Sequence, residues 1–163
     1  MILGSQIHIE APIDAVWTVL ADLEAVVRWT PDAEEARIEG EERGVGAVRI
    51  VTMRGTELEQ RISELEEQTR FTYESANIGQ IVRVVSRWRL EDLGGHTRAI
   101  NVATFTLRDR WMSWLASGRL RRTQVYALAG LKHFVESGEE VGSPPQEVRL
   151  VRRLRANHPL MRQ

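Results

Sequence analysis

Residues 7–31, IHIEAPIDAVWTVLADLEAVVRWTP, decide how the chain folds, because the apolar residues change from a strand period to a helical period at Pro12. Isoleucines alternate with polar residues before Pro12, which predicts a strand over 5–10. Proline is tolerated at the start of a helix, where its missing N–H would be unpaired. Apolar residues then recur at helical spacing, and Asp22 can cap a second short helix that ends before Pro31.

From residue 36 onward the apolar residues recur at every second position, which predicts strands separated by glycine-containing turns. The expected strands are 36–41, 47–53, 56–65, 70–75, 81–92 and 97–107. Their short connections favour antiparallel pairing. Helical spacing returns after residue 109, and Gly118 weakens that run. We therefore expect a short segment over 111–116 and a long helix over 119–137 that stops at Gly138.

The length of 163 residues fits one domain. We expect that domain over 1–138, followed by a basic tail over 139–163 that is mobile or ordered by a partner. The absence of cysteine excludes disulfides and thiolate metal sites. The histidines show no metal-ligand spacing and no nucleotide-binding loop occurs, so we expect no metal and no cofactor. Without a membrane-spanning run or a signal peptide, we expect a cytoplasmic protein.

The charges are divided unevenly along the chain. Residues 1–74 contain 16 acidic and 7 basic residues, a net charge of −9, whereas residues 75–163 contain 7 acidic and 15 basic residues, a net charge of +8. Such asymmetry can indicate a nucleic-acid partner, or two halves that pair within one fold. We favour pairing and expect no nucleic-acid partner, which leaves the arginines at 149, 152, 153 and 155 as the unpaired stretch. Arginine far outnumbers Lys132, the single lysine, as in GC-rich bacterial genomes.

Six short motifs occur in order along the chain: IEAP at 9–12, AVW at 15–17, WTP at 29–31, GVGA at 44–47, GGHTR at 94–98 and AGLK at 129–132. With the order of the elements, they resemble the SRPBCC superfamily, also called START-like or birch-pollen-allergen-like, and within it the polyketide cyclase/dehydrase group. The resemblance covers about residues 3–137. It implies an α+β helix-grip fold, a seven-stranded antiparallel sheet wrapped around the long C-terminal helix, with two short helices after the first strand.

The resemblance also implies a cavity between the sheet and the long helix. Strand alternation places Gln60, Phe71, Tyr73, Ser86 and Trp88 toward it. Either face of strand 97–107 can point inward, and the habit of the family favours Asn101 and Phe105. The other predicted ligand-binding residues are Trp29, Trp111, Trp114, Gln124 and Leu128. A mostly apolar pocket with a few polar groups is typical of small-molecule sites, although satisfied core residues are the alternative explanation for the polar groups.

Two residues are candidates for catalysis. The hydroxyl of Tyr73 can anchor or protonate an enolate oxygen without carrying a charge. The guanidinium of Arg54 can hold a carboxylate or polarise a ketide carbonyl, unless it is simply solvated at the turn before Gly55. Arg49 and Arg54 lie on opposite faces of strand 47–53, so at most one of them points inward, and alternation leaves the inward face open.

The apolar segment 111–115 is a candidate gate of the cavity, a dimer patch or a membrane-touching wedge, in that order of preference. A hydrophobic small molecule is thus the expected partner, and a second copy of the chain is another candidate.

These observations favour a protein that binds a hydrophobic or amphipathic small molecule, and the resemblance implies a cofactor-independent cyclase or aromatase acting on a poly-β-ketone. The alternative is a non-catalytic carrier or sensor of a lipid, a quinone or a similar ligand. A third interpretation is an interaction protein whose basic tail binds an acidic partner. No carboxylate or histidine falls on a securely inward position, which favours carrying over acid–base catalysis.

Overall fold

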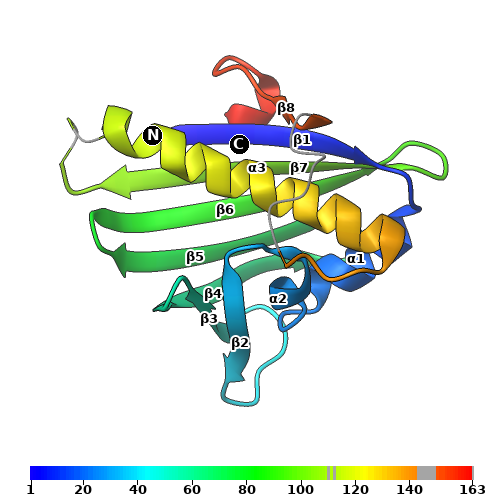
Figure 1. The fold of residues 1–163 in the computed structure, drawn as a ribbon, viewed down its shortest axis with the longest axis horizontal. Coiled ribbons are helices and arrows are strands. Elements are labelled where there is room, and N and C mark those ends of the chain that lie inside the picture. Colours follow the sequence, from blue (N-terminus) through cyan, green and yellow to red (C-terminus); the bar gives the residue numbers. More distant parts are fainter. Residues whose placement is uncertain (110, 112, 143–149, 163) are drawn as a thin grey trace.

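The computed structural model describes residues 1–109, 111, 113–142 and 150–162, and shows one curved sheet that wraps around a long helix (Figure 1). The strands are β1 (Ile2–Ile9), β2 (Ala33–Glu39), β3 (Val48–Met53), β4 (Thr56–Glu66), β5 (Arg70–Ile78), β6 (Ile81–Asp92), β7 (Thr97–Leu107) and β8 (Arg152–Arg153). The helices are α1 (Ile13–Ala21), α2 (Val26–Trp29) and α3 (Ser113–Ser137), and a 3-10 turn, η3, covers Pro159–Met161. The strand order is β2-β3-β4-β5-β6-β7-β1-β8, and neighbouring strands are antiparallel, which confirms the helix-grip fold.

Local sequence signals account for the ends of the helices. The side chain of Asp22 accepts hydrogen bonds from the backbone N–H groups of Glu24 (3.1 Å) and Ala25 (3.2 Å), so it caps the turn that leads into α2. At the end of α3, Gly138 has a φ of 74°, and its N–H donates to the carbonyl of Phe134 (2.8 Å). Glycine adopts this left-handed conformation without the steric cost that a Cβ brings.

The long helix is continuous, and the predicted division at Gly118 is wrong. α3 runs from Ser113 to Ser137 through that glycine. An internal glycine costs a helix about 1 kcal/mol relative to alanine, which the packing of the remaining residues can offset. Among the described residues, no helix is long and apolar enough to cross a bilayer.

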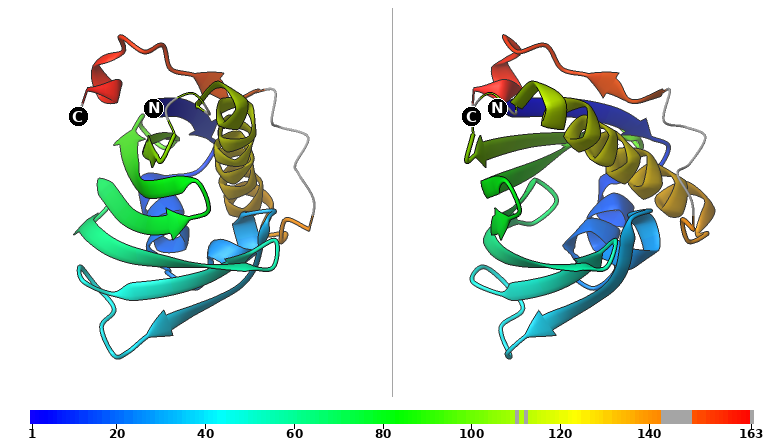
Figure 2. Two further views of the ribbon diagram at one scale, coloured as in Figure 1. Left: turned by 90° about the vertical axis from the view of Figure 1, so that its left-hand side faces the viewer. Right: turned by 60° about the vertical axis from the view of Figure 1, so that its left-hand side comes forward.

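The main core lies between the concave face of the sheet and the helices. Leu128 and Leu131 of α3 are fully buried there against Ile7, Ile62 and Trp88 from three strands. Figure 2 shows how the sheet curves from β1 round to β2, with α3 lying across its concave side. The alternation of apolar and polar residues along the strands therefore selects the inner face, as predicted.

The sheet has one strand more than predicted, and the tail supplies it. β8 pairs with β1, and the N–H of Leu154 donates to the carbonyl of Gly4 (2.9 Å). Met161 is buried on the outer face of the sheet against Ile100 and Val102 of β7. A Cβ on Gly4 would collide with the sulfur of Met161, so this glycine leaves room for the tail. Residues 150–162 thus pack on the domain of their own chain.

Replacement of Gly130 by alanine should destabilise the protein, although alanine is ordinarily the better helix former. A Cβ at Gly130 would run into the backbone carbonyl oxygen of Trp29, where α3 crosses the end of α2. We expect Gly130→Ala to lower the free energy of unfolding by about 2 kcal/mol or more. The measurement is urea unfolding followed by circular dichroism.

Gly118→Ala is the matched control, because a Cβ at Gly118 meets nothing within 4 Å. It should raise the free energy of unfolding by about 0.5–1 kcal/mol. Equal effects of the two substitutions would contradict the close approach of α2 and α3.

Candidate functional site

Most of the residues that the sequence selected as lining are buried between the inner face of the sheet and the helices α2 and α3. Side chains that are less than one tenth exposed include Trp29, Gln60, Phe71, Ser86, Trp88, Asn101, Phe105, Gln124 and Leu128. Tyr73 is half-buried on the same face. The face of β7 that alternation left open is settled, since Asn101 and Phe105 point toward the helix and Ile100 and Val102 point away from it.

The most unusual member of this face is Arg49, which is 2% exposed. Its Nε and Nη2 both donate to the side-chain oxygen of Gln60, at 3.0 and 2.5 Å, and its Nη1 donates to the carbonyl of Leu23 at 3.0 Å. The guanidinium carbon lies 5.7 and 5.4 Å from the ring centroids of Phe71 and Tyr73. Every one of these contacts is neutral, so among the described residues no carboxylate lies beside this buried positive charge.

Burial lowers the pKa of Arg49 from its ordinary value to about 10, and the nearby Tyr73 partly opposes that shift. The group is therefore charged at neutral pH, where the difference of pKa between the folded and unfolded chain costs on the order of 3 kcal/mol. A guanidinium has five N–H donors, of which three are used here. An anion would find both an uncompensated charge and uncommitted donors.

Arg54, the predicted catalytic arginine, lies outside this cluster. It occupies the turn between β3 and β4 with a φ of 51°, and its side chain is 51% exposed. Its guanidinium donates to both carboxylate oxygens of Asp32, at 2.8 and 2.9 Å. Arg49 therefore points inward, and Arg54 does not. On β3, Arg49 shares the inner face with Val51, and its cross-strand partner on β4 is Gln60.

Other buried polar atoms near this face have no hydrogen-bond partner in the part of the chain that the structure describes. They are the indole nitrogens of Trp29 and Trp88 and the hydroxyls of Thr30 and Ser75. The two indoles are in edge contact, with ring centroids 5.7 Å apart. An unpartnered polar atom in a protein interior commonly marks a position that water or a ligand fills. The indoles supply donors only, as Arg49 does.

A second polar cluster joins α3 to the sheet. The amide nitrogen of Gln124 donates to the side-chain oxygen of Asn101 (2.8 Å) and to the carbonyls of Leu3 (3.1 Å) and Asn101 (3.0 Å). Asn101 in turn donates to the hydroxyl of Ser86 (2.9 Å), and Ser5 donates to Gln124 (3.3 Å). Because these groups satisfy one another, this cluster fixes the helix on the sheet, which is the core alternative considered for Ser86 and Asn101.

Two hollows stand out in the described part of the chain, and both lie away from the inner face. One, of about 560 Å³, lies beside the turn between β2 and β3 and is lined by Glu41, Glu42 and Arg61 among others. The other, of about 210 Å³, lies on the outer sheet face between Arg87, Ile100 and Leu160.

Two of the predicted ligand-binding tryptophans lie near the start of α3. Trp111 is 67% exposed, and the side chain of Trp114 lies outside the described residues. Within the described chain, no group of three His, Cys, Asp or Glu side chains is arranged to hold a metal ion.

Comparison with known proteins gives one family and many similar folds. A family model described as "Polyketide cyclase / dehydrase and lipid transport" matches residues 3–136. No curated protein matches the sequence. A solution NMR structure from Thermobifida fusca has 23% identity and a TM-score of 0.70, over 82% of this chain and 92% of that one.

Two further structures carry informative names. The crystal structure of Ara h 8.0201 has 16% identity and a TM-score of 0.69, over 83% of this chain and 97% of that one. The ZhuI aromatase/cyclase from Streptomyces sp. R1128 has 20% identity and a TM-score of 0.67, over 85% and 97% respectively. At these identities the neighbours establish the fold alone.

Replacement of Arg49 and Gln60 by apolar residues should stabilise the protein. The double variant Arg49→Met/Gln60→Leu removes a buried uncompensated charge together with its main acceptor, so we expect the free energy of unfolding to rise by about 1–3 kcal/mol. Chemical denaturation at neutral pH measures it. A double variant less stable than the wild type would show that the guanidinium is a net structural asset.

Arg54→Met is the control, because it removes an exposed arginine that directly follows β3 and lies outside the Arg49 cluster. It should change the stability by less than about 1 kcal/mol.

Proposed function

We propose a function for this chain, which belongs to the polyketide cyclase/dehydrase and lipid transport family of the SRPBCC superfamily. It binds an amphipathic small molecule that places an acidic or carbonyl oxygen at Arg49. The observation that carries the proposal is the buried guanidinium of Arg49, whose hydrogen-bond partners among the described residues are all neutral. A positive charge in an apolar interior is costly until an anion or a strong dipole compensates it. A ligand oxygen supplies that compensation.

The chemistry of the inner face limits what the ligand can be. Arg49, Trp29 and Trp88 offer donors, and the buried polar residues of the described chain include no aspartate, glutamate or histidine. The surroundings are otherwise aliphatic and aromatic. We therefore expect a ligand with an apolar body and several acceptor oxygens, one of them anionic or enolic. Because the two hollows described above lie away from the inner face, we expect binding to displace side chains there, and the half-buried Tyr73 beside Arg49 is the first candidate to move.

A carrier or sensor of such a molecule is the function that these residues support best. General acid–base catalysis needs a group that accepts a proton near the reacting atom. The inner face has a positive charge and hydrogen-bond donors but, among the described residues, no buried carboxylate or histidine to accept one. Binding without turnover requires neither.

Cyclisation of a poly-β-ketone is the second candidate, and a specific observation favours it. The hydroxyl of Tyr73 has no hydrogen-bond partner among the described residues, and its ring lies 5.4 Å from the guanidinium carbon of Arg49. A guanidinium stabilises a developing enolate, and a phenol beside it can donate a proton to that oxygen.

A pair of fluorescent probes tests the role of Arg49 in binding. 1-Anilinonaphthalene-8-sulfonate and N-phenyl-1-naphthylamine share an aromatic body, but only the first carries an anionic group. We expect Arg49→Gln to weaken sulfonate-probe binding at least tenfold, because charged hydrogen bonds are worth about 1.5–3 kcal/mol. The neutral probe should bind both proteins alike.

Arg54→Gln is the control variant and should leave both affinities unchanged. If the sulfonate probe binds wild type and Arg49→Gln equally, the proposal of an anion at Arg49 is wrong. Native mass spectrometry of the purified protein then identifies any ligand that it retains.

Tyr73→Phe distinguishes the cyclase from the carrier. For a cyclase, this variant should form aromatic product from a poly-β-ketone thioester about a hundredfold more slowly, the usual contribution of a general acid, with unchanged probe binding. Tyr126→Phe is the control, since Tyr126 is the other tyrosine and accepts a hydrogen bond from Arg122 on α3. Absence of product formation by the wild type, together with tight probe binding, would leave the carrier as the function.

A further inference from the structure

The charge division seen in the sequence persists in the folded protein. We expected the acidic and basic halves to pair across the fold, but few ion pairs of the described residues join them. Those that do are Arg28–Glu140, Arg83–Glu74 and His96–Glu10. The others connect residues within one half, such as Arg37 with Glu57. Charge is therefore distributed unevenly over the folded protein, and the net charges of its two ends have opposite signs.

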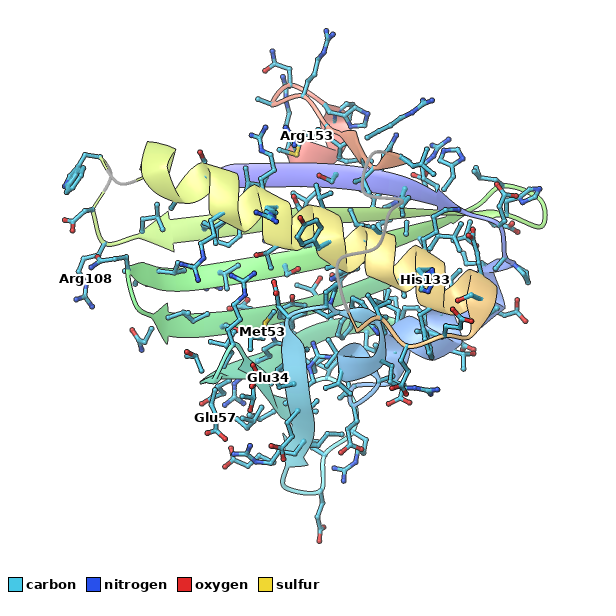
Figure 3. All side chains as sticks on the ribbon, viewed as in Figure 1. Glu34, Met53, Glu57, Arg108, His133 and Arg153 are labelled. Carbon is cyan, nitrogen blue, oxygen red and sulfur yellow. The ribbon has the colours of Figure 1, made fainter. Side chains whose placement is uncertain are left out.

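The tail and the first half of α3 form what we call the basic end. Both lie at the same end of the molecule, beside β1 and opposite β2, β3 and β4, in all three views (Figures 1 and 2). Figure 3 shows Arg153 at this end and Glu34 and Glu57 toward the other. The segment 148–163 contains five arginines and no acidic residue, and 108–122 contains five arginines and one aspartate.

Several arginines of the basic end are exposed, and no ion pair of the described residues compensates their charge. They include Arg152, Arg153 and Arg155 on the tail and Arg119 and Arg122 on α3. Among the ion pairs of the described residues, none involves these five side chains. The tail binds the sheet through its backbone and its apolar side chains, so its charges are left for another surface.

Two large apolar side chains that precede these arginines along the chain are exposed. Trp111, just before α3, is 67% exposed, and Leu150, just before β8, is 61% exposed. Exposed tryptophan next to arginine suits the boundary between lipid headgroups and acyl chains, where the ring inserts and the guanidinium meets phosphate. A nucleic acid would use the arginines but leave the leucine without a role. A second copy would have to place its acidic end here, and two such copies can continue into an open chain.

We infer that the basic end docks on the surface of an anionic lipid bilayer, with the tail arginines and Arg119 and Arg122 facing the headgroups and Trp111 inserted at the interface. Juxtamembrane basic residues each gain about 1 kcal/mol near an anionic leaflet, so a cluster of five binds appreciably while the acidic end is repelled and faces away. The inference is independent of Arg49 and of the proposed ligand.

Vesicle flotation tests the inference with the full-length chain. Vesicles of phosphatidylcholine with about one third phosphatidylglycerol should carry the protein, and vesicles of phosphatidylcholine alone should not. Arg152→Gln/Arg153→Gln/Arg155→Gln should lower the partition coefficient on the order of a hundredfold. About 0.5 M salt should abolish binding, because it screens charges beyond a few ångströms.

A matched control removes the same charge from the other end. Arg37→Gln/Arg43→Gln/Arg61→Gln alters three exposed arginines of the acidic end and should bind vesicles at least as well as the wild type. Arg119→Gln/Arg122→Gln keeps the tail unchanged and should still weaken binding, which guards against an effect of tail unfolding. Trp111→Ala should abolish the blue shift of the tryptophan fluorescence that accompanies binding.

Three results would overturn the inference. The first is no binding to anionic vesicles at low salt, and the second is equal loss of binding in the basic-end and acidic-end triple variants. The third is retention of a double-stranded oligonucleotide, or a salt-sensitive oligomer, by a protein that does not bind the vesicles. In each of these cases, the proposed function still stands if the sulfonate probe binds the wild type more tightly than Arg49→Gln.

Discussion

The buried charge of Arg49 is the constraint around which the inner face is arranged. The side-chain oxygen of Gln60 and the carbonyl of Leu23 receive its hydrogen bonds, and the rings of Phe71 and Tyr73 flank it. A stable core would place an aliphatic side chain there, since removing such a charge usually stabilises a protein. The buried guanidinium lowers the stability of the fold and is nevertheless held by four neighbouring residues. Binding of a ligand therefore explains its presence more readily than a structural role does.

The rest of the fold keeps this position fixed and dry. β3 and β4 hold Arg49 opposite Gln60, while α3 closes the concave side through Leu128 and Leu131. The self-satisfied cluster of Gln124 and Asn101 anchors that helix, so the helix stays on the sheet without using the groups near Arg49. The cluster that holds the helix on the sheet and the unpartnered donors near Arg49 thus lie in different parts of the interior. Residues that stabilise the fold are therefore distinct from those proposed to bind the ligand.

The sequence predicted the architecture because periodicity and end signals are local. Alternation identified the strands, and Asp22 and Gly138 marked turns that the structure contains. It could not choose between Arg49 and Arg54, because apolar residues occupy both faces of β3: Val51 lies on the inner face and Ile50 on the outer one. It missed β8 for a related reason, since two arginines have no apolar period and their pairing depends on the distant contact between Gly4 and Met161. The predicted division at Gly118 is wrong because the helix propensity of one glycine contributes less free energy than the packing of the whole helix.

The most direct test of anion binding at Arg49 is to observe its guanidinium by ¹⁵N NMR while decanoate is added. If the carboxylate binds there, the Arg49 Nε–H resonance shifts saturably and exchanges more slowly with water, while Arg54, already paired with Asp32, does not respond. Saturable binding that shifts other signals and leaves the Arg49 resonance unchanged would contradict it.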